Sequence, residues 1–369
     1  MIHVNTPLLG GNEKKYINEC LDTGWISSEG PFVARFEKEM SSYVERNFGI
    51  AVSNGTAALE IAVRVIGIKE GDEVIIPAFT IISPAQAVVY SGGKPILIDA
   101  DPVTWCMDVT QIEAKITAKT KAIIVVHIYG FPTDMQPVLE LAKKYNLKVI
   151  EDAAEMHGQT YNGAMCGSFG DISIFSFYPN KHITTGEGGM IVTNDPDLAE
   201  RCKSLRNLCF KPEKRFVHDE LGWNYRMTNL QAALGVAQLE NIEKHILRKR
   251  EIGSIYNDLL KDLPHVDLMP VKTAFAKNIY WVYAILLRDS FPHNAEWIMK
   301  ELGKVGIGTR PFFYPMHLQP VFKNMGWYED ESYPVGERIA ERGFYIPSGL
   351  ALIETEMIEV SGKLHNILK

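Results

Sequence analysis

A lysine in a glycine-rich loop is the residue in this sequence with the clearest chemical potential. Lys181 lies in the stretch 176–189, between the apolar runs 171–177 and 190–194. A lysine held against buried strands is partly removed from water, which lowers its pKa and makes the amine a nucleophile. Such a lysine suits Schiff-base chemistry with an aldehyde cofactor such as pyridoxal phosphate (PLP). The alternative interpretation is a surface lysine beside a glycine turn.

A carboxylate, Asp152, is the second candidate. The segment 147–158 predicts a buried strand that ends in carboxylates, and ligands in open α/β sheets collect at the carboxyl ends of strands. An aspartate there can pair with a protonated pyridine nitrogen, which keeps PLP an effective electron sink. Asp152 can also simply cap a following helix. The combination of Lys181 with Asp152 favours the cofactor interpretation.

The start of a predicted helix supplies a candidate phosphate site. Asn54, Gly55 and Thr56 open a helical stretch at 57–65. Free N–H groups and the positive dipole end at a helix start attract phosphate, and Thr56 adds a hydroxyl. Ser176 is a second hydroxyl that can reach the same phosphate. Ordinary helix capping explains the Asn-Gly-Thr pattern equally well.

Taken together, the motifs resemble the DegT/StrS-type nucleotide-sugar aminotransferases, a branch of the fold-type I PLP enzymes. The resemblance implies an α/β fold with a mostly parallel mixed sheet covered by helices and a smaller α+β C-terminal domain. The matching segments run nearly from end to end: 25–28, 53–56, 71–77, 127–130, 151–155, 176–189, 224–228 and 310–317.

The resemblance also implies roles for individual residues. Lys181 would hold PLP as an imine and shuttle protons, Asp152 would pair with the pyridine nitrogen, and Glu155 would lie by the ring oxygen or the sugar. The other implied cofactor contacts are Gly55, Thr56, Ala57, Ile81, Ser176 and, from the neighbouring subunit, Asn224. The implied substrate-side residues are Trp25, Ser27, Arg310 and His317. The shared site implies a homodimer. Ile81 stands where many relatives stack an aromatic ring on the pyridine.

The implied activity is transfer of the amino group of L-glutamate to C4 of a nucleotide-linked 4-keto-6-deoxy sugar. Within the family, the resemblance best fits GDP-4-keto-6-deoxymannose as the substrate and GDP-perosamine as the product. This reaction would belong to O-antigen lipopolysaccharide biosynthesis. A dTDP- or UDP-linked substrate remains open, as do a PLP-fold sugar dehydratase and a non-catalytic regulator. The dehydratases replace the lysine by histidine, but counting from Ser176 to Gly186 puts Lys181, not His182, at that position.

Length and composition limit the remaining possibilities. At 369 residues the chain exceeds the usual single core of about 250–300 residues, so we expect two lobes. The resemblance implies a large PLP-binding domain at 13–245 and a small domain at 246–369, with 1–12 packing near the latter. The net charge of −7 argues against nucleic acid or an anionic membrane as partner. Five scattered cysteines without metal spacing indicate free thiols and no metal. We expect a cytoplasmic location, since no signal pattern or long apolar run is present.

Alternating apolar runs and amphipathic segments predict a sheet covered on both faces. The predicted strands are 73–77, 95–100, 122–127, 147–152, 171–177 and 190–194, with a helix at 134–145. His127, at the end of one run, is predicted to be a hydrogen-bonded buried residue rather than a catalyst.

The C-terminal half starts with a capping-box pattern at Thr228 and Gln231. It predicts one long helix from 229 to about 260 that bridges the two lobes. A strand at 281–287 and a helix at 295–305 are predicted for the small domain.

Overall fold

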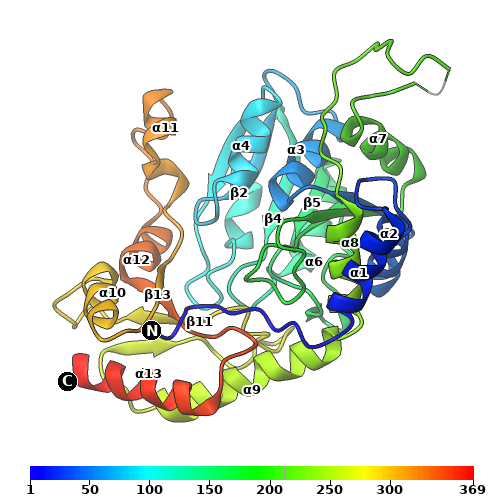
Figure 1. Ribbon diagram of the computed structural model, residues 1–369. Coiled ribbons are helices and arrows are strands. Elements are labelled where there is room, and N and C mark those ends of the chain that lie inside the picture. The colour runs from blue at the N-terminus through cyan, green and yellow to red at the C-terminus, as the bar shows by residue number, and fades with distance from the viewer. Residues whose placement is uncertain (212) are drawn as a thin grey trace.

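The computed structural model describes residues 1–211 and 213–369 and contains two separate main sheets (Figure 1). The larger sheet has seven strands in the order β1-β9-β8-β5-β4-β2-β3. Only β9 runs antiparallel to its neighbours in this sheet. The strands are β1 Phe48–Val52, β2 Glu73–Pro77, β3 Lys94–Ile98, β4 Thr120–Val126, β5 Lys148–Asp152, β8 Ile172–Ser176 and β9 Gly189–Thr193.

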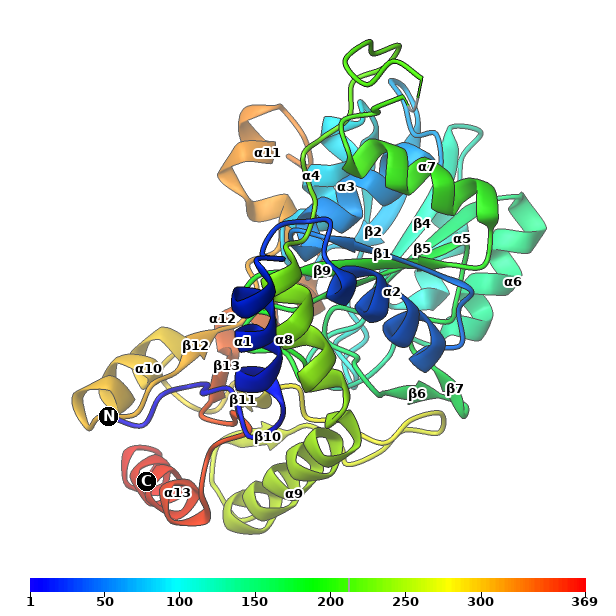
Figure 2. The same cartoon turned by 45° about the vertical axis from the view of Figure 1, so that its right-hand side comes forward.

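Helices cover both faces of the seven-stranded sheet (Figure 2). One hydrophobic cluster joins it to α3 (Gly55–Val65), α4 (Ser83–Tyr90) and α7 (Pro196–Arg206). A second cluster joins the other face to α1 Glu13–Thr23, α2 Pro31–Tyr43, α6 Met135–Tyr145 and α8 Asn229–Leu239. Strands buried on both faces need continuous apolar runs rather than alternation, which is why the runs were visible in the sequence. The predicted α/β fold is confirmed, and every predicted strand of this sheet is present.

The smaller sheet is antiparallel, with the order β10-β11-β13-β12. Its strands are β10 Val266–Leu268, β11 Tyr283–Leu287, β12 Arg310–Pro311 and β13 Gly343–Ile346. The helices around it are α9 Ile242–Leu260, α10 Ala295–Lys304, α12 Pro334–Arg342 and α13 Glu354–Ile367. The helices α9, α10 and α13 share a third hydrophobic cluster, which includes Ile2, whereas Ile339 of α12 belongs to the first cluster. The N-terminus therefore lies against this sheet, where Ile2 pairs with Ile307.

Short elements complete the described part of the chain. They are the 3-10 helices Val109–Gln111 and Met316–Leu318, the helices α5 Ile112–Lys115 and α11 Pro320–Asn324, and the strand pair β6 Thr160–Tyr161 and β7 Ala164–Met165. Within residues 1–211 and 213–369, no helix combines the length and the apolar character that crossing a membrane requires.

Two predictions from the C-terminal half need correction. The predicted helix 229–260 is two helices, α8 and α9, because Asn241 leaves the helical conformation at φ −110° and ψ 9°. The side-chain amide of Asn241 (Nδ2) donates to the Ala237 carbonyl at 3.2 Å, and this local bond competes with continuation of the helix. The predicted strand 281–287 begins two residues late, at Tyr283, because the pairing of β11 with β13 starts at Tyr283 and Ile346.

Candidate active site

A cavity of about 540 Å³ opens at the carboxyl ends of the central strands. Asp152 ends β5 and Ser176 ends β8, while Lys181 follows β8 in the next loop. The first turn of α3 forms one side of this cavity, and Trp281, Phe313 and Tyr345 from the C-terminal half line another. The position agrees with the rule that ligands of α/β sheets bind outside the carboxyl ends of the strands.

Lys181 is largely buried, with its side chain 10% exposed. Its Nζ lies 3.6 Å from Oε1 of Glu155 and 4.0 Å from the ring centroid of Trp281. Burial lowers the pKa of Lys181, and the charges of Glu155 and Asp152 act in the opposite direction. Because a lowered pKa increases the fraction of lysine in the free amine form, Lys181 is suited to nucleophilic attack and proton transfer.

The two carboxyl groups of the site are buried as well. Burial raises the pKa of Glu155 to about 7 and that of Asp152 to about 6, and the charge of Lys181 offsets part of each shift. Glu155 accepts a hydrogen bond from the Tyr129 amide at 2.8 Å, and Asp152 accepts one from the Ala154 amide at 3.0 Å. A buried carboxylate with one hydrogen bond gains stability from a nearby cation, which a protonated pyridine nitrogen would supply.

The N-terminus of α3 forms the third part of the cavity. Asn54 caps the helix by accepting from the Ala57 amide at 2.8 Å, and the Thr56 hydroxyl lies 2.9 Å from that of Ser83. The Thr80 hydroxyl also lines the cavity and has no hydrogen-bond partner among the described residues. Hydroxyls at a helix start suit a phosphate group, which would satisfy this buried oxygen.

Gly55 lets this helix start approach the end of β8. A Cβ built on Gly55 would lie 2.9 Å from Cβ of Ser176, closer than real Cβ contacts allow. The Ser176 hydroxyl also lines the cavity. Together the amine, the buried carboxylates and the hydroxyls fit the aldehyde, the pyridine nitrogen and the phosphate of PLP.

The structure brings eight of the sequence-predicted site residues to this cavity: Gly55, Thr56, Ala57, Ile81, Asp152, Glu155, Ser176 and Lys181. The other five do not line it. Trp25, Ser27 and Asn224 are exposed, although Tyr225, next to Asn224, does line the cavity. Arg310 is exposed on β12, where it pairs in register with Tyr345. His317 is buried, and its Nε2 lies 2.9 Å from Oε1 of Glu337.

Sequence reasoning missed the aromatic wall of the cavity. Trp281, Phe313 and Tyr345 lie between 100 and 164 residues beyond Lys181 in the chain. Trp281 opens an apolar run of the smaller sheet, so its pattern indicated only core packing. Nothing in the local sequence distinguishes an aromatic residue that packs in the core from one that packs over an active-site lysine.

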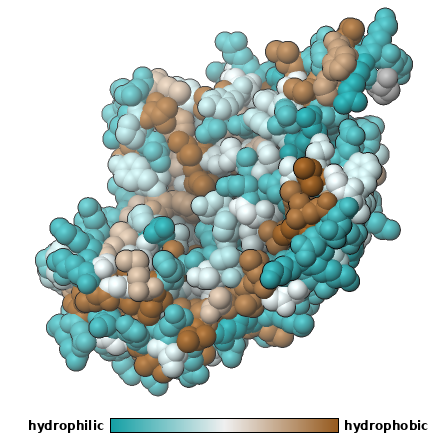
Figure 3. All heavy atoms as spheres, in the orientation of Figure 1, coloured by the Kyte–Doolittle hydropathy of each residue, from teal (hydrophilic) through white to brown (hydrophobic). Residues whose placement is uncertain are grey.

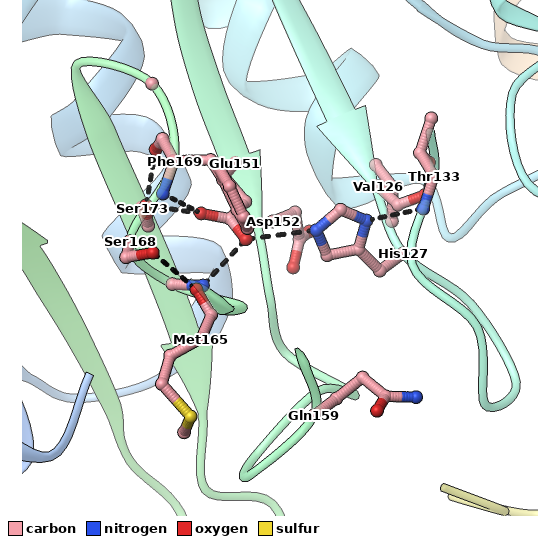
Figure 4. A network of polar contacts seen from close by, with 12 residues as sticks. Val126, His127, Thr133, Glu151, Asp152, Gln159, Met165, Ser168, Phe169 and Ser173 are labelled. Atoms are coloured by element: carbon pink, nitrogen blue, oxygen red, sulfur yellow. Dashed lines mark hydrogen bonds and ion pairs between the residues drawn. The ribbon is translucent and has the colours of Figure 1, made fainter. Parts of the chain in front are cut away.

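His127 lines the cavity and belongs to a buried polar network with Glu151 and Thr133 (Figure 4). The Thr133 amide donates to its Nδ1 at 3.0 Å, so Nε2 carries the proton and donates to Glu151 at 3.0 Å. Glu151 also accepts from the Gly167 and Phe169 amides and from the Ser173 hydroxyl. The prediction that His127 is a hydrogen-bonded buried residue is confirmed.

Cys166 lies near the same network. Its sulfur, one His127 nitrogen and one Glu151 oxygen are all within 4.8 Å of one another, a spacing that a metal ion accepts. The hydrogen bonds of Glu151 and His127 already occupy these groups, so the arrangement is that of a structural hydrogen-bond network.

Comparison with known proteins gives a consistent result along the chain. The model of the DegT/DnrJ/EryC1/StrS aminotransferase family matches residues 7–365. A GDP-perosamine synthase of Escherichia coli O157:H7 is 45% identical, with 97% of this chain and 96% of that protein covered. A GDP-perosamine synthase of Caulobacter vibrioides is 41% identical, with 100% and 98% covered.

Solved structures agree with the sequence comparison. DesV of S. venezuelae, solved in complex with a ketimine intermediate, aligns with a TM-score of 0.89 at 30% identity, covering 97% of this chain and 94% of that one. The aminotransferase TlmJ of Streptoalloteichus hindustanus aligns with a TM-score of 0.91 at 28% identity, covering 99% and 98%. The chain therefore belongs to the DegT/DnrJ/EryC1/StrS aminotransferase family, whose cofactor, PLP, fits the cavity described above.

Proposed function

We propose that this protein transfers the amino group of L-glutamate to C4 of GDP-4-keto-6-deoxymannose and so makes GDP-perosamine. The observation that carries the proposal is the cavity containing Lys181, Asp152 and Glu155, in a chain similar over its whole length to two GDP-perosamine synthases. Cytoplasmic O-antigen biosynthesis is the proposed setting.

Bound PLP supplies an electron sink for breaking the bond to the α-proton of the amino donor. Asp152 holds the proton on the pyridine nitrogen, since a carboxylate buried at the end of β5 is stabilised by a cation beside it. Lys181 is the group that holds the cofactor and, once its amine is free, removes the α-proton of glutamate. In the second half of the cycle Lys181, in its protonated ammonium form, delivers a proton at C4 of the sugar.

Glu155 sets the charge around Lys181. Its Oε1 lies 3.6 Å from the lysine Nζ and its Oε2 is held by the Tyr129 amide, so the carboxyl group is fixed beside the reacting nitrogen. In the proposed role it hydrogen-bonds the ring oxygen of the cofactor or a hydroxyl of the sugar. Its raised pKa of about 7 lets it exchange a proton near neutrality.

The phosphate is held by the start of α3 and the end of β8. The proposed contacts are the amides of Gly55, Thr56 and Ala57 and the hydroxyls of Thr56 and Ser176. Ile81, which is 46% exposed at the cavity wall, offers an aliphatic face to the pyridine ring. An aliphatic face packs by dispersion and apolar burial without aromatic stacking.

We propose further that the active site is completed by a second copy of the chain. Asn224 is exposed and lies outside the cavity of its own chain, which agrees with a contact to the phosphate of a neighbouring subunit's cofactor. The exposed apolar residues Leu21, Trp25 and Ile26 support burial of this region in a homodimer. Figure 3 shows separate hydrophobic patches within the otherwise largely hydrophilic surface.

The proposed contacts with the sugar nucleotide are made by the four remaining predicted residues, Trp25, Ser27, Arg310 and His317. Trp25 and Ser27 would close over the sugar, and Arg310 would pair with the diphosphate. His317 would act through Nδ1, which has no partner among the described residues, because Nε2 is taken by Glu337. The proposed domain division places 13–245 around PLP and 246–369, with 1–12, around the smaller sheet.

Product analysis tests this function. The purified protein is incubated with PLP, L-glutamate and, in separate reactions, GDP-, dTDP- and UDP-linked 4-keto-6-deoxy sugars. The proposal predicts a C4 amine, identified by mass spectrometry and NMR, formed fastest from the GDP sugar and absent with Lys181→Ala. A faster reaction with a dTDP or UDP sugar would contradict the substrate assignment, and amination at C3 would contradict the position.

A further inference from the structure

Trp281, from the C-terminal half of the chain, contacts the active-site lysine directly. It is 3% exposed, and its ring centroid lies 4.0 Å from Nζ of Lys181. A cation over the face of an indole at this distance is attracted by the negative face of the ring. The Trp281 Nε1 donates to the carbonyl of Asn180 at 2.9 Å, so the indole also holds the backbone next to the lysine.

The contacts of Trp281 continue to the other partner of the lysine. The indole is parallel to the ring of Tyr129, with centroids 6.0 Å apart and 1° between the planes. The Tyr129 amide donates to Oε2 of Glu155, whose Oε1 faces Nζ of Lys181. Lys181, Trp281, Tyr129 and Glu155 therefore form a closed ring of contacts around the amine.

Tyr129 adopts a costly backbone conformation to make this arrangement. Its φ is +56°, in the left-handed region that residues other than glycine seldom adopt. In this conformation the amide points to Glu155 while the hydroxyl accepts from the Phe313 amide at 3.1 Å. Tyr129, which stacks on Trp281, is thus held by Glu155 from the N-terminal half of the chain and by Phe313 from the C-terminal half.

Two carboxyl groups influence the pKa of the lysine amine. Asp152, at the end of β5, and Glu155, three residues later, raise the pKa of Lys181, and burial lowers it. His157 lies near Lys181, and burial together with the lysine charge lowers its pKa to about 3, so the imidazole is neutral at ordinary pH. The indole is the uncharged group that contacts the amine directly.

We propose that Trp281 is a positioning residue for Lys181, and that its indole face retains the lysine ammonium beside Glu155 when the lysine is not bonded to the cofactor. Leucine or methionine at this position would still exclude water but would lack the negative ring face. Phenylalanine would keep a ring face and lose the Nε1–H bond to Asn180. This inference rests on the proposed role of Lys181.

The test measures the pKa of Lys181 in the full-length apoprotein, without substrate or turnover. Trace acetylation with isotopically labelled acetic anhydride is carried out from pH 6 to 11, and the peptide that contains Lys181 is quantified by mass spectrometry. The variants are Trp281→Leu and Trp281→Phe. Trp281→Met replaces the leucine variant if circular dichroism shows that the latter is unfolded.

A matched control is available in the same chain. Lys94 lies 5.8 Å from the ring centroid of Trp327, a second lysine–indole pair away from the cavity. Trp327→Leu should leave the pKa of Lys181 unchanged. Trp281→Leu should lower it by about one unit, a tenfold change in the acid dissociation constant, because the ammonium loses its attraction to the ring. Trp281→Phe should give a smaller decrease.

An unchanged pKa of Lys181 in Trp281→Leu would overturn the inference. A raised pKa would overturn it too, because the indole would then act only by excluding water. A wild-type protein that takes up PLP and aminates the sugar, combined with either result, contradicts this inference alone. Failure of the wild type to take up PLP through Lys181 contradicts the proposed function instead.

Discussion

The Oε1 atom of Glu155 lies 3.6 Å from the Nζ atom of Lys181, and both side chains are at most 10% exposed. Burial shifts their pKa values toward each other, raising that of Glu155 to about 7 and lowering that of Lys181. The two shifts bring the proton affinities of the groups closer together, which suits the proposed reaction, in which the lysine must both accept and release a proton.

Glu155→Gln should lower the pKa of Lys181 by about one unit relative to the wild type. The neutral glutamine amide would lack the negative charge with which Glu155 stabilises the lysine ammonium. The pH dependence of PLP capture by the apoprotein, followed by absorbance, should shift to lower pH accordingly. Glu341→Gln, at an exposed position, is the control. An unshifted profile in Glu155→Gln would show that the carboxyl group does not govern the lysine.

Asp152→Asn should have opposite effects on stability and activity. The native pKa of Asp152 is raised from 3.8 to about 6, so the folded apoprotein binds more protons than the unfolded chain between these values. The contribution of Asp152 to the free energy of unfolding therefore falls as pH rises from about 4 to 6. Above that range, the ionised Asp152 destabilises the folded apoprotein by roughly 3 kcal/mol. The neutral amide avoids this cost.

Thermal unfolding of the apoprotein at pH 4.5 and pH 8 checks this prediction. Asp152→Asn should be stabilised relative to wild type at pH 8 more than at pH 4.5, while transamination falls on the order of 100-fold or more. The exposed Asp330→Asn variant should show neither effect. Equal stability differences at the two pH values would contradict a buried, charged Asp152.

Gly55→Ala should weaken PLP binding about tenfold, since the added Cβ meets Cβ of Ser176 at 2.9 Å and pushes the helix start away from β8. Titration of the apoprotein with PLP, followed by absorbance, measures the change. Gly303→Ala in α10, where a Cβ meets nothing within 4 Å, should bind PLP as the wild type does. Unweakened binding in Gly55→Ala would argue against a phosphate at this helix start.

Glu151→Gln should destabilise the protein by about 3 kcal/mol or more with little effect on the KM for glutamate. The carboxylate accepts from His127, Ser173 and two backbone amides, and an amide NH₂ group would face some of these donors. Denaturant unfolding measures the loss. A large change in KM without loss of stability would mean that the network in Figure 4 is catalytic.

Mixing two inactive variants tests the shared active site. Lys181→Ala and Asn224→Ala are each expected to lose most activity as pure proteins. After partial unfolding and reassociation together, heterodimers should regain activity, because one of their two sites then carries neither substitution. No regain in samples shown by mass spectrometry to contain heterodimers would place Asn224 and Lys181 in the same chain's site.

Local patterns predicted the large sheet well because each of its strands is a continuous apolar run buried on both faces. Three site residues were also predictable from local patterns. Asp152 ends an apolar run, Lys181 lies in the loop after another run, and Thr56 lies at the start of a helix. Trp281 was not, because its contact with Lys181 depends on how the smaller sheet packs on the larger one. The break at Asn241 was not predictable either, because asparagine also occurs inside helices and its bond to the Ala237 carbonyl is seen only in the structure.

The most direct test of the central claim follows the cofactor absorbance of the protein through both half-reactions. The account predicts that L-glutamate bleaches the visible PLP band of the wild type and that GDP-4-keto-6-deoxymannose restores it, while dTDP- and UDP-linked sugars do so much more slowly. Lys181→Ala should show no such cycle. A wild-type band that glutamate leaves unchanged, or an equal cycle in Lys181→Ala, would contradict the account.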